Sequence, residues 1–212
     1  MIRKRINPHI LCLAKQQSGS VSLSKSCETI YLILKKHTIF PAPIERVMYY
    51  TRFHTLFCEM ILVGNEEGLT HLHLNTGEGK RLFEIGDGWV QDDAFFSGTV
   101  DQITDYCSGK RKTFNVTINP RGTEFQKKVW KELTGIPYGE LRTYKEIAGA
   151  MGNENAARAV GMANSRNPIP LIIPCHRVIG INGKLVGFAH GLAMKGRLIH
   201  FERAGVANGP EP

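Results

Sequence analysis

The sequence has few of the features that mark secreted, membrane-bound or metal-binding proteins. Its 212 residues include only five cysteines, and their spacing, without any Cys-x-x-Cys pair, indicates neither a disulfide framework nor a zinc finger. No apolar run reaches transmembrane length, and no convincing cleavage site follows the short apolar patch Ile10–Ala14. We therefore expect a reducing, intracellular location, with no membrane contact, no metal and no cofactor.

Acidic residues are also scarce, and they are unevenly distributed. The chain has 27 Lys and Arg against 19 Asp and Glu, a net charge of +8. Residues 1–47 have a balance of +6, residues 48–120 one of −4 and residues 121–203 one of +7. A basic balance most often reflects a solvated surface and less often DNA binding. The charge alone therefore leaves a nucleic-acid partner open, and it points to the C-terminal half for any such contact.

Composition and breaker residues divide the chain into four expected parts. They are an extension over residues 1–47, an N-terminal α/β domain over 48–120, a C-terminal domain over 121–205 and a tail over 206–212. The first part opens with Arg3-Lys4-Arg5 and ends in Pro41-Ala42-Pro43, a linker-like stop. We expect it to be poorly ordered or to precede a natural start at Met48, and an organelle presequence is the alternative.

Apolar residues alternate with polar ones in the N-terminal domain, which predicts strands with one buried face. Residues 75–112 instead look helical with loops, and Asn119–Gly122 breaks the chain before its second half. The expected strands are Tyr49–Phe53, Phe57–Val63, Leu69–Leu74 and Phe114–Ile118, with a turn at Gly64–Gly68. The first three are expected to pair as an antiparallel sheet.

Two capping boxes mark the starts of helices in the C-terminal domain. Thr123 precedes Gln126 by three residues, and Thr143 stands in the same relation to Glu146. In such a box the threonine hydroxyl and the later side chain satisfy free N–H groups of the first turn. The first helix is expected to end at Pro137–Gly139. Its buried face is composed of Phe125, Val129, Trp130 and Leu133.

The second capping box begins a segment with helix-turn-helix spacing. The helix from Thr143 is expected to run to about Met151, and a turn at Gly152–Glu154 leads into a second helix over Ala156–Asn164. The side chains of this second helix are mostly small, with Arg158 the long one in its first turns. Small residues fit a helix packed in the core, but they also permit close approach to DNA. There a lone arginine can fill the gap left by a flipped base.

Cys175 is the candidate nucleophile of the chain. The stiff segment Asn167–Pro170 and an expected buried strand, Leu171–Ile173, lead to it, and it stands between Pro174 and His176. Only a thiolate attacks electrophiles well, so such a cysteine needs a neighbouring imidazole and an orienting carboxylate. The alternative is a structural cysteine buried in a strand.

Three short motifs together resemble those of the O6-alkylguanine-DNA alkyltransferases, the methylated-DNA–protein-cysteine methyltransferase family. They are Arg158–Gly161, Asn167–Pro170 and Pro174–Val178, and the similarity extends from about Met48 to Gly205. The resemblance implies an α+β fold whose N-terminal part is an antiparallel sheet with helices, of the ribonuclease H-like type. It implies a mostly helical C-terminal domain with a helix-turn-helix and short strands.

Proteins of this family repair DNA in a reaction that consumes the protein. The resemblance implies that a monomer binds double-stranded DNA through the minor groove and flips O6-alkylguanine out of the stack. The alkyl group then moves irreversibly onto Cys175. O4-methylthymine is a second candidate substrate. The implied location is the cytoplasm, at the nucleoid, or the nucleus if the source is a eukaryote.

The resemblance also assigns catalytic roles to individual residues. A Glu–His–water–Cys relay would form the thiolate through Glu202, His176 and Cys175. Tyr144 would donate a hydrogen bond toward O6 of guanine, since the leaving base must be stabilised by protonation. Asn167 would act as a hinge between the recognition helix and the active-site segment.

DNA contacts and a base pocket follow from the same resemblance. Arg158 would stack in place of the flipped base, while Lys145 and Asn153 would touch the DNA backbone. The expected pocket residues are Val178, whose carbonyl would accept from the guanine amine, Phe188, which would stack, Ala189, whose N–H would reach O6, and His190. Some relatives have glycine at the position of His190, so we expect its bulk to narrow the pocket and to disfavour benzyl-sized groups.

Three other functions remain open from the residues alone. A non-reacting lesion sensor related to the alkyltransferases commonly has tryptophan in place of Cys175. A cysteine hydrolase would leave the helix-turn-helix without a use, and we find no oxyanion loop. A transcription regulator would need long polar side chains on a recognition helix that is rich in alanine here.

Overall fold

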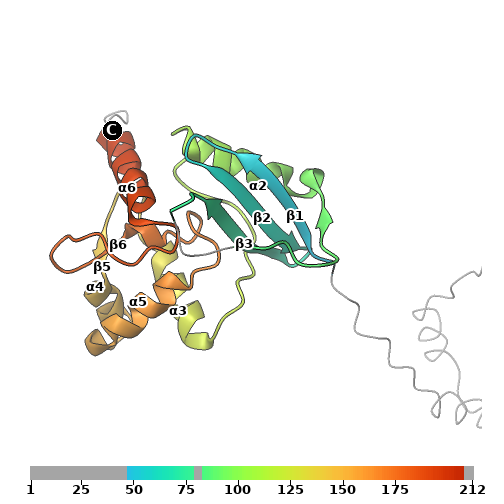
Figure 1. The fold of residues 1–212 in the computed structure, drawn as a ribbon. Coiled ribbons are helices and arrows are strands. Elements are labelled where there is room, and N and C mark those ends of the chain that lie inside the picture. The colour runs from blue at the N-terminus through green and yellow to red at the C-terminus, as the bar shows by residue number, and fades with distance from the viewer. Residues whose placement is uncertain (1–46, 79–82, 208–212) are drawn as a thin grey trace, which may run out of the picture. The chain divides into compact units, whose positions relative to one another are not determined.

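A four-stranded sheet forms the first part of the fold, in the order β3-β2-β1-β4 (Figure 1). The computed structural model describes residues 47–78 and 83–207. The strands are β1 (Tyr49–His54), β2 (Glu59–Asn65), β3 (Gly68–Asn75) and β4 (Val90–Gln91). The first three pair antiparallel, as predicted, and the two-residue β4 adds a parallel partner to β1 that the sequence did not predict.

One long helix packs on this sheet. Helix α2 (Asp93–Cys107) begins where the Asp92 side chain accepts a hydrogen bond from the N–H of Phe95. The Thr51 hydroxyl of β1 donates to the Asp93 carboxylate at 2.6 Å and ties the first turn of α2 to the sheet. The buried side chains of α2 and of the sheet belong to one apolar core; among them are Met60, Leu62, Leu72, Phe96, Ile103 and Tyr106.

The expected strand Phe114–Ile118 is wrong in most of its length. The segment pairs with β3 at one bridge, where the N–H of Leu69 donates to Thr117 and the N–H of Asn119 donates back to Leu69. Because this pairing is parallel, the residues before Ile118 lie beside the turn that precedes β3. There the backbone N–H and carbonyl of Asn115 bond to the side chain of Gln102, so no ladder forms over residues 114–117.

Both predicted capping boxes are present. Thr123 begins α3 (Glu124–Thr134) and Thr143 begins α4 (Tyr144–Ala150), each with reciprocal hydrogen bonds to the third helical residue. Helix α3 ends earlier than predicted, with Gly135 as its C-cap. Of its predicted core face, Phe125 is 38% exposed while the other three residues are buried.

The helix-turn-helix is confirmed as α4 followed by α5 (Ala157–Ser165), with the 3-10 turn η3 (Glu154–Ala156) between them. The indole N–H of Trp130 in α3 donates to the carbonyl of Ala163 at 3.0 Å and holds the last turn of α5. The last described helix is α6 (Leu192–Ala207). Within residues 47–78 and 83–207, no helix is long and apolar enough to cross a membrane.

The expected strand Leu171–Ile173 is a turn instead. The Asn167 amide donates to the Ile173 carbonyl at 2.7 Å and its oxygen accepts from the N–H of Ile169 at 3.0 Å, so one side chain closes the loop. Leu171 takes a left-handed φ of 70° at the tip while its side chain stays buried. Asparagine bonds to nearby backbone in this way satisfy groups that a strand would have paired.

The short sheet β5 (Arg142–Thr143) with β6 (Val178–Ile179) brings the two halves of the site together. Its strands run parallel, with Arg142 opposite Val178 and Thr143 opposite Ile179. The start of α4 is therefore fixed beside the 3-10 turn η4 (Cys175–Arg177) that precedes β6. The α+β fold expected from the sequence is confirmed, whereas the proposed limits at residues 120 and 205 stay predictions. The extension over 1–47 lies almost wholly outside the described residues.

Replacing Thr143 with alanine should destabilise the protein, because the hydroxyl accepts from the N–H of Glu146 at the start of α4. We expect the free energy of unfolding to fall by about 1 kcal/mol, as for other N-cap threonines, measured by urea denaturation. The control is Thr113→Ala, at an exposed loop threonine. Equal stability of the two variants would contradict the prediction.

Candidate active site

Cys175 opens the 3-10 turn η4 and is almost fully buried, with 4% of its surface exposed. Its N–H donates to the carbonyl of Ile173 at 2.8 Å, directly after the loop that Asn167 closes. The predicted hinge asparagine therefore lies between α5 and the cysteine, where it shapes the backbone that leads to the thiol. Its contacts agree with the predicted position but do not test a hinge motion.

His176 and Glu202 form a buried pair beside this cysteine. The His176 Nε2 lies 2.8 Å from Glu202 Oε1, and both side chains are essentially inaccessible to solvent. A carboxylate only accepts, so Nε2 carries the proton and Nδ1 presents a lone pair. Within the described residues, Nδ1 has no hydrogen-bond partner. The pair therefore has the tautomer that a base acting on a neighbouring thiol requires.

Glu202 accepts hydrogen bonds from two further side chains and one backbone N–H that the sequence analysis missed. The Arg177 guanidinium donates to both carboxylate oxygens, at 2.9 Å from Nε and 2.8 Å from Nη2, and its Nη1 reaches the carbonyl of Ile136. The Tyr106 hydroxyl donates to Oε1, and the N–H of Gly139 donates to Oε2 at 3.0 Å. An arginine inside an apolar run is the sequence signal, because a buried guanidinium needs a carboxylate partner.

The electrostatics of the pair follow from burial and these bonds. Burial alone would raise the pKa of Glu202, but the hydrogen bonds from His176 and Arg177, together with the guanidinium charge, outweigh it and hold the pKa far below its usual range. Burial lowers the pKa of His176 below the ordinary 6.5, although Glu202 opposes that change. The glutamate is therefore ionised and the histidine neutral at physiological pH. Burial and the nearby carboxylate raise the pKa of Tyr106, which stays a donor.

Tyr144 and Lys195 lie near enough to Cys175 for its charge to affect the pKa of each. The Tyr144 hydroxyl donates to the carbonyl of Val186 at 3.1 Å, and burial, with the negative charge that Cys175 can carry, raises its pKa to about 12. The Lys195 ammonium, also missed by the sequence analysis, is buried and donates to the carbonyls of Val178 and Val186. Burial lowers its pKa to about 8. The predicted Val178 acceptor thus already has one intramolecular donor.

The predicted pocket residues Phe188, Ala189 and His190 lie on one loop before α6. His190 does not have the surroundings that we expected. Its ring is buried, donates from Nδ1 to the Leu74 carbonyl of β3 at 3.1 Å, and lies edge-on to Phe188 at 5.5 Å. The His190 ring thus packs against the sheet, and this position does not support the expectation that the ring narrows the pocket.

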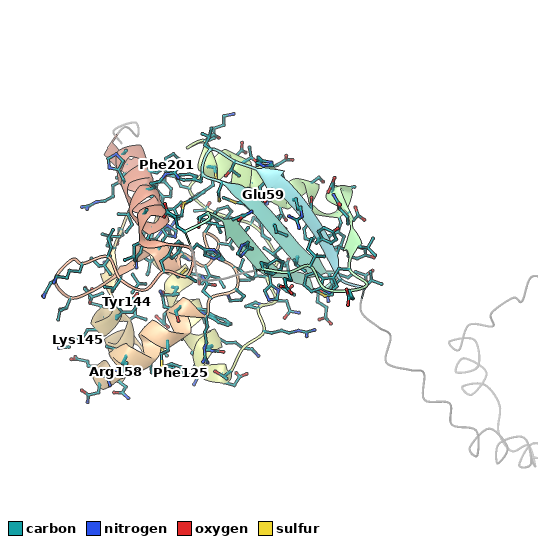
Figure 2. All side chains as sticks on the ribbon, in the orientation of Figure 1. Glu59, Phe125, Tyr144, Lys145, Arg158 and Phe201 are labelled. Carbon is teal, nitrogen blue, oxygen red and sulfur yellow. The ribbon has the colours of Figure 1, made fainter. Side chains whose placement is uncertain are left out.

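The three predicted DNA contacts belong to the helix-turn-helix, and Figure 2 shows two of them, Lys145 and Arg158, projecting from it. Arg158 is exposed near the start of α5. Lys145 is exposed on α4 and pairs with Glu154 at 3.3 Å. Asn153 caps η3, because its side chain accepts from the N–H of Asn155 at 3.1 Å. The three residues thus lie on α4, at the start of η3 and on α5, and their contact with DNA remains a prediction.

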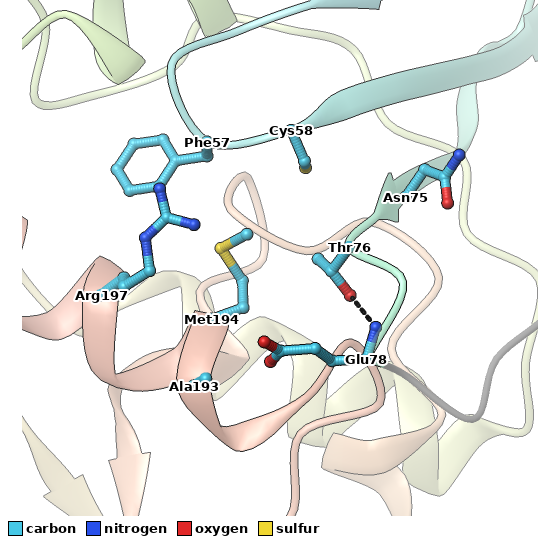
Figure 3. A pocket seen from close by; sticks show the side chains of 8 residues that line it. All are labelled: Phe57, Cys58, Asn75, Thr76, Glu78, Ala193, Met194 and Arg197. Atoms are coloured by element: carbon cyan, nitrogen blue, oxygen red, sulfur yellow. Dashed lines mark hydrogen bonds between the residues drawn. The ribbon is translucent and has the colours of Figure 1, made fainter.

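The other described cysteines have no comparable surroundings. Burial raises the pKa of Cys58 to about 11 and that of Cys107 to about 12, so both thiols stay protonated. Cys58 lines a cavity of about 270 Å³ between the end of β3 and α6, which Figure 3 shows with Thr76, Glu78 and Arg197. Cys175 does not line this cavity. Among residues 47–78 and 83–207, no group of three or more His, Cys, Asp or Glu could hold a metal ion.

Comparison with known proteins matches both halves of the chain. Residues 48–120 match the family model described as "6-O-methylguanine DNA methyltransferase, ribonuclease-like domain", and residues 124–204 match "6-O-methylguanine DNA methyltransferase, DNA binding domain". A methylated-DNA–protein-cysteine methyltransferase of Methanosarcina acetivorans is 50% identical over 155 residues, which cover 73% of this chain and 98% of the relative. The protein of that name from Mycobacterium bovis is 42% identical over 160 residues, covering 74% and 94%.

Solved structures give the same result. The crystal structure of Mycobacterium tuberculosis O6-methylguanine methyltransferase has a TM-score of 0.70 and 40% identity, covering 78% of this chain and 97% of that one. A second structure, of the M. tuberculosis protein in complex with DNA, has a TM-score of 0.68 and 42% identity, covering 74% and 94%. Family models, relatives and structures agree with one another and with the geometry around Cys175, and this chain therefore belongs to the methylated-DNA–protein-cysteine methyltransferase family.

Proposed function

We propose that this protein repairs double-stranded DNA by moving an alkyl group from O6 of guanine onto Cys175 in a single turnover. The observation that carries the proposal is the buried pair of His176 and Glu202 next to that cysteine. Membership of the family makes the protein a transferase that acts on DNA. The lesion, the flipping of the base and the single turnover are part of the proposal, as are a monomeric state and a location where DNA is found, the nucleoid or the nucleus.

The first step is removal of the thiol proton. His176 is neutral and its Nδ1 lone pair is free to accept that proton, directly or through one water. Glu202, fixed by Arg177, stabilises the imidazolium that forms. The Cys175 sulfur then forms a bond to the alkyl carbon, the bond from that carbon to O6 breaks, and its electron pair goes to the guanine. The guanine stays part of the DNA and takes up one proton, which balances the proton that His176 removes from the thiol.

Tyr144 is proposed to donate toward the departing base. Its raised pKa keeps the hydroxyl protonated, which suits a hydrogen-bond donor. Without substrate the hydroxyl donates to Val186, so binding of the base must exchange this bond for one to guanine. The N–H of Ala189 and the second lone pair of the Val178 carbonyl are proposed to read the base edge, with Phe188 stacking on it.

Delivery of the base is proposed to depend on the helix-turn-helix. Lys145 and Asn153 would contact the phosphates, and the Lys145–Glu154 pair would open for this. Arg158 would enter the stack and fill the space of the extruded base. Asn167 would keep α5 and Cys175 in a fixed relation, since both of its amide atoms bond to the connecting loop.

The central test uses a duplex that contains O6-methylguanine. We expect mass spectrometry of the digested protein to find one added methyl group on Cys175 and no turnover beyond one equivalent. The Cys175→Ala variant should accept none, and Cys107→Ala serves as the matched control because its thiol is also buried. An unmodified Cys175 after prolonged incubation would refute the proposal.

Lowering the pH from 7.5 to 6.5 should reduce the rate of transfer by less than half. Burial lowers the pKa of His176 below 6.5, so more than half of the rings stay neutral and able to accept a proton at pH 6.5. The rate should fall further at lower pH, as the histidine becomes protonated in the folded protein. Single-turnover rates under excess protein provide the measurement. A rate that has already halved at pH 6.5 would show an ordinary histidine pKa and contradict this prediction.

Replacing Arg158 with alanine should slow methyl transfer from duplex DNA by about tenfold to a hundredfold. The expected size reflects the few kcal/mol needed to unstack a base, which the arginine would offset. The matched control is Arg203→Ala, at an exposed arginine of α6. If both variants react at the same rate, the arginine has no such role.

A further inference from the structure

The loop that carries Phe188 and Ala189 is fastened to the sheet of the N-terminal half. The His190 Nδ1–H donates to the carbonyl of Leu74 at 3.1 Å, and the Thr76 hydroxyl donates to the His190 carbonyl at 2.8 Å. Both bonds join segments more than 110 positions apart in the sequence. The side chain of His190 is thus held by Leu74 at the end of β3, and its carbonyl is held by Thr76, which follows that strand.

Burial makes these bonds effective. His190 is 2% exposed, and its ring packs edge-on against His73 of β3 at 5.2 Å between ring centroids. A buried hydrogen bond faces little competition from water, and a buried donor without its acceptor is costly. The imidazole therefore has one favourable place, against the end of β3.

The chain on either side of His190 is held just as closely. Gly191 has a left-handed φ of 96°, and a Cβ there would lie 2.9 Å from the Cβ of Glu78. The segment after β3 and the start of α6 thus meet with no room between them, beside the cavity of Figure 3, which Thr76 and Glu78 also line. At the other end of the loop, Tyr144 and Lys195 both donate to the carbonyl of Val186.

We propose that His190 is a positioning residue, through which the N-terminal sheet holds the pocket loop in the place where Ala189 and Phe188 meet the base. The expected effect on methyl transfer rests on the proposed function, but the attachment of the loop to the sheet can be measured independently of that function. Since the two anchors lie at Val186 and at His190, the three residues between them are the part of the loop that they fix.

Substitutions can distinguish the effect of the Nδ1 hydrogen bond from the effect of the size of the ring. In His190→Asn the amide N–H takes nearly the place of the imidazole Nδ1–H, whereas His190→Ala has no donor. Thr76→Val keeps the shape of threonine and removes its hydroxyl. The matched control is His200→Asn, at an exposed histidine of α6.

Two measurements on these variants test the proposal. We expect amide hydrogen exchange of peptides covering residues 186–191 to be faster in His190→Ala and Thr76→Val, and close to that of the unmodified protein in His190→Asn and His200→Asn. Transfer of methyl from duplex DNA to Cys175 should be about tenfold slower in His190→Ala, the factor that corresponds to one buried hydrogen bond of ordinary strength. In His190→Asn it should recover to within about threefold.

The outcomes separate the inference from the proposed function. Unchanged exchange in both His190→Ala and Thr76→Val overturns the fastening of the loop, whether or not Cys175 reacts. Faster exchange with an unchanged transfer rate overturns the positioning role. A rate in His190→Asn as low as in His190→Ala, at equal thermal stability, shows that the bond to Leu74 is not the cause. If His190→Ala does not fold, the exchange and transfer rates of Thr76→Val and His190→Asn test the proposal in its place. A wild-type protein that leaves Cys175 unmodified refutes the proposed function alone.

Discussion

The buried carboxylate of Glu202 is the interaction on which the site depends. It accepts hydrogen bonds from Tyr106 of α2, Gly139 before β5, and His176 and Arg177 of η4, so one side chain joins α6 to three other segments. An ionised carboxylate in the protein interior is tolerated only when it is paired and its oxygens are satisfied. Removing a single partner of such a charge typically costs about 3–5 kcal/mol. The need to satisfy Glu202 therefore fixes where η4 lies relative to α2 and α6.

The chemistry of the site follows from this constraint. Arg177 supplies a permanent positive charge, so the carboxylate stays ionised and His176 need not be protonated to pair with it. Burial then keeps the histidine neutral, and the bond from Nε2 leaves Nδ1 as the base. In isolation the imidazole would be an ordinary titrating group. The tautomer and the charge state at Cys175 are set by residues that do not touch the thiol.

Local signals in the sequence predicted local structure well. The boxes at Thr123 and Thr143 and the small-residue helix after them are confirmed, because their hydrogen bonds join residues three positions apart. The strands expected at Phe114–Ile118 and Leu171–Ile173 are wrong, because the side chains of Gln102 and Asn167 bond to the backbone there. Strand propensity does not include such competition from side chains.

The sequence predicted only part of the site, because several of its hydrogen bonds join residues that are far apart in the chain. Cys175 and His176 are adjacent, and Glu202 came from a resemblance; the structure brings the three together. Tyr106, Arg177 and Lys195 were missed, since their partners lie 96, 25 and 17 positions away. The orientation of the His190 ring could not be predicted either, because the residue type gives the size of a side chain but not the direction in which it points.

The bond between Trp130 and Ala163 has a practical consequence. The chain has two tryptophans, and Trp130 is 2% exposed, with its indole N–H on a carbonyl in the last turn of α5. Indole emission depends on the hydrogen bonding and polarity around the ring. The molecule thus contains its own fluorescent reporter in contact with the helix that bears Arg158, and after substitution of Trp89, movements of that helix against α3 can be followed in solution without attaching a dye.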